Sequence, residues 1–420
     1  MKSNKILFLL FVLLVLPGCG GGGGGGSSSS SGGGSSQTTN VLPLTVNGST
    51  CDSSLIASSG GYINDPCVSV TVCTPGSSTC VTINSILLDT GSYGLRIFKQ
   101  ALGSVSLTQV TSSSGSPLAE CVQYADNTSD WGPVQIARVS LGNEPAVQVP
   151  IQVIDATFAT IPSSCGPPIY TPDTKPSDEG FNGILGVGPF IYDCGAICVT
   201  SSVGQYYSCS GSTCTSTVVS LASQVQNPVA SFPTDNNGVI VQLPGVAAGG
   251  TTSLTGSILF GIGTQSNNSL SGATAYPLDQ NGNFITIFNG VSFNEASNPN
   301  SGSFTDSGSN GLFFPSPSMS TPDAGELPDC AGVYSFWFCP PSTTNFSATI
   351  AGASGSPTKS VSFQIGNFIS LINSPNYVFS DIGGNVSGTF DWGLPFYLGR
   401  NVYIGFEKES SLGTGQYIAY

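Results

Sequence analysis

The sequence contains no histidine among its 420 residues. A Ser-His-Asp triad, a Cys-His pair and a zinc-peptidase helix with two histidines all depend on imidazole, so these three kinds of catalysis are excluded. Charged side chains make up only 8% of the chain, which is too few for long surface helices. Any hydrolytic chemistry must therefore use carboxylates, hydroxyls or the few lysines.

Positive charge is the scarcer of the two signs. Nine Lys and Arg stand against 23 Asp and Glu, which gives a formal net charge of −14. Nucleic acids and anionic membrane surfaces attract basic proteins. Neither is therefore expected to bind the folded part of this chain.

Glycine and proline, in contrast, are abundant, with 55 and 28 residues. They separate many short apolar runs, a pattern typical of an all-β protein. The length suits one large domain or two ordinary ones. In the second half, the apolar runs at 284–288, 361–365, 392–396 and 402–406 are predicted to be strands.

The N-terminus carries the features of an exported lipoprotein. A basic start is followed by eleven apolar residues at 6–16, a run too short to span a bilayer but suited to a signal peptide. Leu16-Pro17-Gly18-Cys19 resembles a bacterial lipobox, which predicts a lipoprotein signal peptide at 1–19 with Cys19 as the acylated residue. Ordinary signal cleavage beside an unrelated cysteine is the alternative.

A flexible tether is predicted at residues 20–40, of which 20–36 are only Gly and Ser. Such a segment would hold a folded body away from a membrane anchored through Cys19. Gly20 is not the aspartate that usually retains lipoproteins in the inner membrane. The expected location is the bacterial cell envelope, with the outer membrane favoured if the host has one.

Twelve cysteines remain beyond Cys19, and an even number in an exported chain predicts up to six disulfides. Their pairing cannot be deduced from the sequence. The spacings of 194–198 and 209–214 also admit a metal site, but they fit no familiar zinc pattern and no histidine is present, so no metal is expected. The twelve are Cys51, Cys67, Cys73, Cys80, Cys121, Cys165, Cys194, Cys198, Cys209, Cys214, Cys330 and Cys339.

An internal repeat is the strongest functional signal in the chain. Asp89-Thr90-Gly91-Ser92 recurs 217 residues later (306 minus 89) as Asp306-Ser307-Gly308-Ser309, and an apolar pair follows each copy. One copy alone is more often a turn at the end of a strand. Two copies with matching flanks favour a pair of carboxylates, one from each half of the chain.

The segments around the first copy are predicted strands. Residues 85–88 form an apolar strand that delivers Asp89, and residues 121–132, which include Tyr124, form a polar turn between strands. Val134 to Leu141 and residues 147–153 alternate apolar and polar side chains and are predicted to pair. Residues 181–188 are an apolar strand flanked by glycines.

With these residues in hand, the chain resembles the bilobal, pepsin-like aspartic proteases over roughly residues 84–407. It also resembles uncharacterised bacterial lipoprotein-like members that carry the same loops. The resemblance implies two related β-barrel-like lobes with a cleft between them, here residues 41–235 and 236–420. It further implies an aspartic endopeptidase that acts as a monomer on an extended peptide and needs no cofactor.

The resemblance also assigns roles. Asp89 and Asp306 would be the catalytic pair, sharing one proton and activating a water molecule between them. Thr90 and Ser307 would join the two loops across the lobe interface, Ser92 and Ser309 would hydrogen-bond the outer carboxylate oxygens, and Gly91 and Gly308 would permit the close approach of the loops. Tyr124 would be the flap tyrosine that closes over the substrate.

The chain departs from the family around this tyrosine. Ala125 stands where glycine normally follows it. Arg96, seven residues after Asp89, replaces the tryptophan that supports the tyrosine, and Trp131 is the candidate to take over that support.

Two other classes of function stay open. A catalytically inactive pepsin-like lipoprotein could bind a protein or glycan in the same cleft, although such relatives usually lose one aspartate or its hydroxyl neighbour. A structural surface lipoprotein or adhesin with chance motifs would also be rich in Gly, Ser, Thr and disulfides. The two intact loops favour the enzyme.

Overall fold

The computed structural model describes residues 40–270, 272–296, 301–316 and 327–420. The predicted signal peptide, Cys19 and all but the last residue of the tether lie outside them. Strands dominate the described chain, so the all-β prediction is confirmed. The longest α-helix in these ranges has six residues, and none there is long and apolar enough to cross a membrane.

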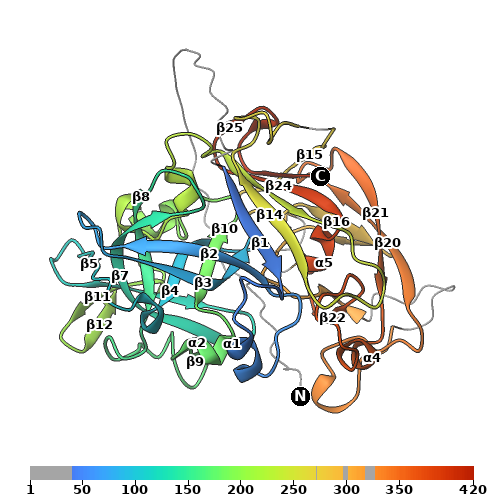
Figure 1. Cartoon of the computed structure of the whole chain (residues 1–420), viewed down its shortest axis with the longest axis horizontal. Helices are drawn as coiled ribbons and strands as arrows, with labels where there is room; N and C mark the ends of the chain where they lie inside the picture. The colour runs from blue at the N-terminus through green and yellow to red at the C-terminus, as the bar shows by residue number, and fades with distance from the viewer. Residues whose placement is uncertain (1–39, 271, 297–300, 317–326) are drawn as a thin grey trace.

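Six strands of the first half close into a barrel (Figure 1). Each pairs with the next, and the last pairs with the first. Closure leaves none of the six as a free edge and buries their alternate apolar side chains in one core. In order around the barrel they are β2 (Pro66–Cys73), β3 (Cys80–Asp89), β10 (Gly183–Val187), β4 (Tyr93–Phe98), β8 (Val147–Ile154) and β7 (Thr128–Ser140).

The predicted turn around Tyr124 is present and joins two strands. β6 (Leu118–Gln123) pairs antiparallel with the start of β7, and β7 and β8 form the second predicted pair. The other elements of the first half are short: β5 (Thr108–Gln109), β9 (Thr171–Pro172), β11 (Tyr206–Ser210), β12 (Thr213–Ser216), α1 (Ser53–Ser58), α2 (Pro176–Glu179), α3 (Ala196–Thr200), η1 (Lys99–Leu102), η2 (Leu221–Ser223) and η3 (Pro228–Ser231).

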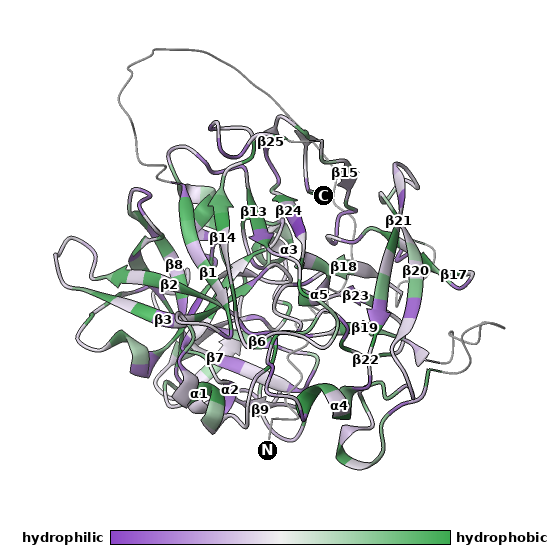
Figure 2. Cartoon of the chain, turned by 45° about the vertical axis from the view of Figure 1, so that its right-hand side comes forward, coloured by the Kyte–Doolittle hydropathy of each residue, from purple (hydrophilic) through white to green (hydrophobic). Residues whose placement is uncertain are grey.

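A second group of strands joins the two ends of the chain. β1 (Val41–Val46) pairs with β2 of the barrel on one side and with β14 on the other, so it links the barrel to this group. Beyond β1 the order is β14 (Leu254–Phe260), β13 (Gly238–Leu243), β24 (Arg400–Gly405), β27 (Tyr417–Ala419) and β15 (Ala275–Pro277). In Figure 2, β1, β13 and β14 show hydrophobic segments, and several buried residues of these strands belong to the main core.

The second half contains two four-stranded sheets packed around phenylalanines, among them Phe288, Phe314 and Phe390. One sheet has the order β18 (Ser303–Thr305), β23 (Phe390–Trp392), β19 (Leu312–Phe314) and β22 (Gly383–Asn385). The other has the order β17 (Val291–Phe293), β16 (Ile285–Phe288), β20 (Thr344–Ala351) and β21 (Thr358–Ile365). The remaining elements are β25 (Glu409–Ser410), β26 (Gly413–Thr414), η5 (Gly332–Tyr334), α4 (Phe368–Ile372) and α5 (Leu394–Tyr397).

One strand prediction is wrong over most of its length. Residues 392–396 were expected to be extended, but β23 ends at Trp392 and α5 begins at Leu394. Pro395 explains the change. It has no N–H to donate to a strand neighbour, whereas the first turn of a helix leaves its N–H groups unpaired in any case.

Six disulfides are present, which confirms the predicted number, and the structure supplies the pairing. Five of them join cysteines no more than 16 residues apart, whereas Cys121–Cys165 closes a loop with a separation of 44. The six pairs are Cys51–Cys67, Cys73–Cys80, Cys121–Cys165, Cys194–Cys198, Cys209–Cys214 and Cys330–Cys339.

We expect the long-range disulfide to stabilise the protein most. In the chain-entropy model, the separation of 44 for Cys121–Cys165 corresponds to about 4 kcal/mol, and the separation of 5 for Cys209–Cys214 to about 2 kcal/mol. Replacing each pair with alanine and measuring the free energy of unfolding in urea tests this order. The second pair is the matched control, because it lies in the same apolar cluster. Equal losses would contradict the expectation.

Candidate active site

The two aspartate loops meet between the halves of the molecule. β3 ends at Asp89, and β18 ends one residue before Asp306. Each carboxyl group affects the pKa of the other. A Cβ added to Gly91 would lie 2.5 Å from Cγ of Asp306, so only glycine fits at this point of contact. The pairing of carboxylates that the repeat predicts is present.

Reciprocal hydrogen bonds hold the loops together. The backbone N–H of Ser307 donates to Oγ1 of Thr90 at 2.9 Å, and the N–H of Thr90 donates to Oγ of Ser307 at 3.1 Å. The Ser307 hydroxyl also donates to the carbonyl of Leu88 at 2.7 Å. Tyr397 of α5 bonds to the Thr90 hydroxyl at 2.6 Å. These hydrogen bonds join the two loops in the way expected of Thr90 and Ser307.

Each carboxyl group is braced by its own loop. The N–H of Gly91 donates to Oδ1 of Asp89 at 2.7 Å, and the N–H of Gly308 donates to Oδ1 of Asp306 at 2.8 Å. The Ser92 hydroxyl donates to Oδ2 of Asp89. In the other loop, the Ser309 hydroxyl donates to Oδ2 of Asp306 at 2.8 Å. All eight residues predicted for the paired loops are thus brought together.

The same three-strand unit surrounds each loop. In the first half, β10 runs parallel to β3 and antiparallel to β4, with Ile184 opposite both Leu87 and Arg96. In the second half, β23 runs parallel to β18 and antiparallel to β19, with Asp391 opposite both Phe304 and Phe313. Leu87 and Phe304 each precede their aspartate by two residues. The internal repeat therefore extends from sequence to strand pairing.

Neither aspartate is exposed to solvent, since the exposed fraction of each is 0%. Burial raises the pKa of Asp89, while hydrogen bonds from its neighbours and the charge of Arg96 oppose the rise. Burial also raises the pKa of Asp306 well above its usual range, and the negative charges of Asp89 and Asp391 raise it further. The environment therefore favours an ionised Asp89 beside a protonated Asp306.

Tyr62 lies against the second loop, and nothing in the sequence pointed to it. Its hydroxyl donates to the carbonyl of Gly308 at 3.1 Å, and its buried ring meets the edge of Phe181. Two residues on, the Asn64 side chain donates to the carbonyls of Asn310 and Phe379. The Cys51–Cys67 disulfide closes the loop that carries Tyr62 and Asn64. Because the disulfide pairing could not be deduced from the sequence, the position of these two residues could not be predicted either.

The structure does not bring Tyr124 to the aspartates through any hydrogen bond between described residues. Its hydroxyl donates to Oδ2 of Asp130 at 2.6 Å, and the residue is only 4% exposed. It packs in an apolar cluster with Tyr62, Leu87, Ile184 and others. Trp131 does not replace the missing tryptophan, because it packs against Tyr207 in a different cluster.

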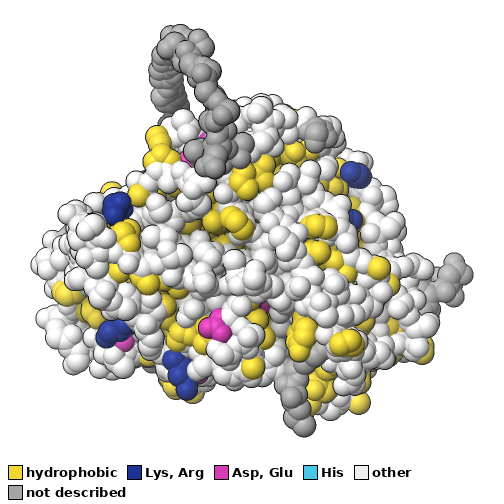
Figure 3. Space-filling model, in the orientation of Figure 1, with side chains coloured by type: hydrophobic (Ala, Val, Ile, Leu, Met, Phe, Trp, Pro, Cys, Tyr) yellow, Lys and Arg dark blue, Asp and Glu magenta, His cyan; other side chains and the backbone are white. Residues whose placement is uncertain are grey.

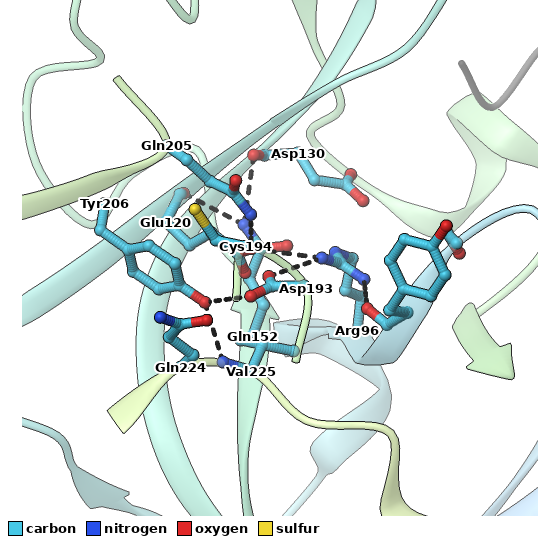
Figure 4. Close-up of polar contacts among 12 residues, drawn as sticks. Arg96, Glu120, Asp130, Gln152, Asp193, Cys194, Gln205, Tyr206, Gln224 and Val225 are labelled. Carbon is cyan, nitrogen blue, oxygen red and sulfur yellow. Dashed lines mark hydrogen bonds and ion pairs between the residues drawn. The ribbon is translucent and has the colours of Figure 1, made fainter. Parts of the chain in front are cut away.

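Arg96 instead forms the centre of a buried ion-pair network (Figure 4). Its guanidinium lies 3.2 Å from Glu120 and 3.0 Å from Asp193, and it donates to the carbonyl of Tyr93 at 2.7 Å. Tyr206 donates to the other oxygen of Asp193 at 2.6 Å. Burial alone would lower the pKa of Arg96, but the charges of Glu120 and Asp193 oppose this effect, and the pKa is raised. The network fixes β4, the strand that follows the first aspartate loop.

One group of possible metal ligands occurs in the described part of the chain, and it consists of Cys51, Asp65 and Cys67. The two sulfurs are bonded to each other, so neither is a thiolate that could bind a metal ion. The aspartate pair itself is braced by serine hydroxyls and backbone N–H groups. These are donors, which suit carboxyl groups rather than a cation.

A family model described as a protein of unknown function, DUF3443, matches residues 36–420. The chain belongs to this family. No curated protein matches it. The DUF3443 match includes both aspartate loops, the strands that pair beside them and all twelve cysteines of the disulfides.

We expect this DUF3443 protein to be most stable in acid. Burial raises the pKa of both Asp65 and Asp130 to about 7, so the folded state binds protons that the unfolded state has already lost near pH 4. Stability is then full below pH 4 and falls by several kcal/mol, to order of magnitude, as the pH rises through 7.

Urea unfolding at pH 4 to 8 measures this dependence. Asp65→Asn and Asp130→Asn should flatten it, because neither side chain then titrates. Asp155→Asn is the control, since the pKa of Asp155 is lowered by Lys99 and Thr157 despite its partial burial. A wild-type stability that rises between pH 4 and 8 would contradict the expectation.

Proposed function

We propose that this protein is an aspartic endopeptidase of the pepsin-like type. The supporting observation is the pair of buried carboxyl groups, Asp89 and Asp306, each braced by matching donors from its own loop. With histidine absent from the chain, such a pair is its clearest means of activating water. The reaction is hydrolysis of a peptide bond by a water molecule held between the two groups.

The two carboxyl groups take different roles. Asp89, ionised, removes a proton from the water molecule, whose oxygen then attacks the carbonyl carbon of the peptide bond. Asp306, protonated, gives its proton to the carbonyl oxygen as the tetrahedral intermediate forms. The proton held by Asp89 then passes to the amide nitrogen, the C–N bond breaks, and Asp306 regains a proton from the intermediate. No cofactor takes part.

The bilobal pepsin-like arrangement belongs to the same proposal. It is supported by the repeated unit of β3, β10 and β4 in the first half and β18, β23 and β19 in the second. The lobes would be residues 41–235 and 236–420, with an extended peptide bound between them. The second lobe would differ from the closed barrel of the first, because its strands form two four-stranded sheets.

Both aspartates are fully covered, so an extended peptide cannot reach them in this conformation. Substrate entry is proposed to move the segment closed by Cys51–Cys67, because its Tyr62 is bonded to Gly308 of the second loop. The Tyr62 hydroxyl is hydrogen-bonded to the carbonyl of Gly308, and the Tyr62 ring packs in the apolar cluster that contains Leu87 and Ile184. A backbone carbonyl next to apolar side chains is what an extended peptide would need for binding. We assign this segment as the cover of the site.

The same burial favours the alternative function, a catalytically inactive surface lipoprotein that binds a partner. A permanently covered pair of aspartates would serve as a structural junction between the two halves.

In either function, the protein would be held at the cell envelope through Cys19, with the outer membrane favoured, and would act as a monomer. The face drawn in Figure 3 carries few charged side chains, which suits neither nucleic acid nor an anionic surface.

The central test is cleavage by residues 40–420, expressed in an oxidising compartment and assayed on a peptide mixture between pH 3 and 7. Asp89→Asn and Asp306→Asn should each lower kcat/KM by about a thousandfold or more, because neither amide can take or give the proton. Asp381→Asn is the matched control, since Asp381 is also buried but contacts Gly249 and lies outside the pair.

A transition-state inhibitor of the pepsin class should block the wild-type activity. Wild-type turnover in the Asp89→Asn protein would refute the mechanism. A folded wild-type protein that cleaves nothing at any pH would favour the binding function instead.

Removing the cover should raise activity. Tyr62→Ala deletes both the hydroxyl on Gly308 and the ring beside Phe181, so a larger fraction of molecules is open, and kcat/KM for a short peptide should rise about tenfold. Tyr62→Phe loses only the hydroxyl and should give a smaller rise. If Tyr62→Ala lowered activity as much as Asp89→Asn, Tyr62 would not be a cover.

A further inference from the structure

A third carboxyl group lies beside the pair. Asp391, on β23, is 0% exposed, and neither of its oxygens has a hydrogen bond of normal geometry within the described residues. A buried carboxyl group left in this state is costly, so its presence requires an explanation. The first half of the chain has no such group at the corresponding position, where β10 carries Ile184.

Strand register places Asp391 on the same face as Asp306. Asp391 lies opposite Phe304 on the parallel strand β18, and Phe304 precedes Asp306 by two residues. Side chains two residues apart on a strand, and side chains directly opposite on neighbouring strands, point to the same side of a sheet. The carboxyl group of Asp391 therefore faces the site and not the opposite side of the sheet.

Ser309 connects the two carboxyl groups. Its hydroxyl donates to Oδ2 of Asp306 at 2.8 Å, and it lies close enough to Asp391 to influence that group as well. Burial raises the pKa of Asp391, and the Ser309 hydroxyl acts in the opposite direction. Ser309 therefore favours the charged form of Asp391, the form that can act on Asp306 by charge.

We infer that Asp391 is a positioning residue that acts on Asp306, directly by charge and through Ser309, and keeps Asp306 protonated towards higher pH. This inference rests on the proposed function, because it assigns Asp391 to the upper pH limit of the same site. It does not make Asp391 a group that touches substrate.

The electrostatics of the pocket agree with this role. The titratable groups that act on Asp391 or are affected by it are Asp89, Asp306 and Tyr397. Tyr62, on Gly308, is the other titratable side chain at the second loop, and Asp391 has no Lys or Arg ion-pair partner within the described ranges. Burial raises the pKa of Asp391 well above its usual range. As the pH rises, a charge on Asp391 would oppose ionisation of Asp306.

The test is the pH profile of kcat/KM for Asp391→Asn, a variant of the same shape without charge. The alkaline limb should move down by about one pH unit, a loss of about tenfold at the pH of that limb, while the acidic limb stays in place. Asp381→Asn, which removes another buried carboxyl group of the same half, should leave both limbs unchanged. A loss that is equal at every pH would mean a merely structural role and would overturn the inference.

A second measurement separates this inference from the proposed function. In protein labelled with ¹³C at the aspartate carboxyl groups, the Asp306 resonance, identified as the one missing from Asp306→Asn, is titrated by NMR with and without Asp391→Asn. A lower midpoint in the variant supports the inference, and an unchanged midpoint overturns it. If wild-type protein cleaves nothing, the enzyme proposal fails while this titration still decides the role of Asp391.

Discussion

The site depends on the reciprocal hydrogen bonds between Thr90 and Ser307. Each hydroxyl accepts from the backbone N–H of the other loop, so each half supplies the partner that the other lacks. Both groups are buried, and a loop left without its partner would carry an unsatisfied N–H and hydroxyl at the cost of desolvation. Strands at each side extend this junction, because β3 leads to Asp89 and β18 to Asp306. The distance between the carboxyl groups is thus a consequence of the contact between the halves.

The second constraint on the structure is the free-energy cost of burying charged carboxylates. This cost is severe because the chain has few Lys and Arg side chains to neutralise them. Arg96 is the sole Lys or Arg in a buried ion pair within the described residues, and it compensates Glu120 and Asp193. Asp65, Asp130, Asp306 and Asp391 are buried without such a partner, and their pKa values are raised. Protonation is the remaining way to neutralise them. A protein built in this way favours acidic surroundings, which agrees with an acidic pH for the proposed reaction.

The sequence was most informative where local chemistry dictates structure. The repeated Asp-hydroxyl-Gly-hydroxyl loops predicted the meeting of Asp89 and Asp306, because glycine and serine at fixed offsets fix the turn and the carboxylate donors. Alternating patterns predicted the β7–β8 hairpin. Tyr62 could not be found in this way, since its position depends on a disulfide partner and on contacts with residues near 308. The position of Asp391 could not be predicted for a related reason. It lies in a short apolar stretch, and only the register of β23 shows that its side chain faces the site.

The two halves share the same arrangement of three strands around the aspartate, but their charged side chains stand at different positions in it. Seven residues after the aspartate, the first half has Arg96 and the second has Phe313. On the strand opposite, the first half has Ile184 and the second has Asp391. The signs differ as well, because the charge of Arg96 lowers the pKa of Asp89 whereas that of Asp391 raises the pKa of Asp306. A symmetric pair of carboxyl groups would have no preferred base. These substitutions in the common arrangement make the surroundings of the two aspartates unequal, which favours a proton on Asp306.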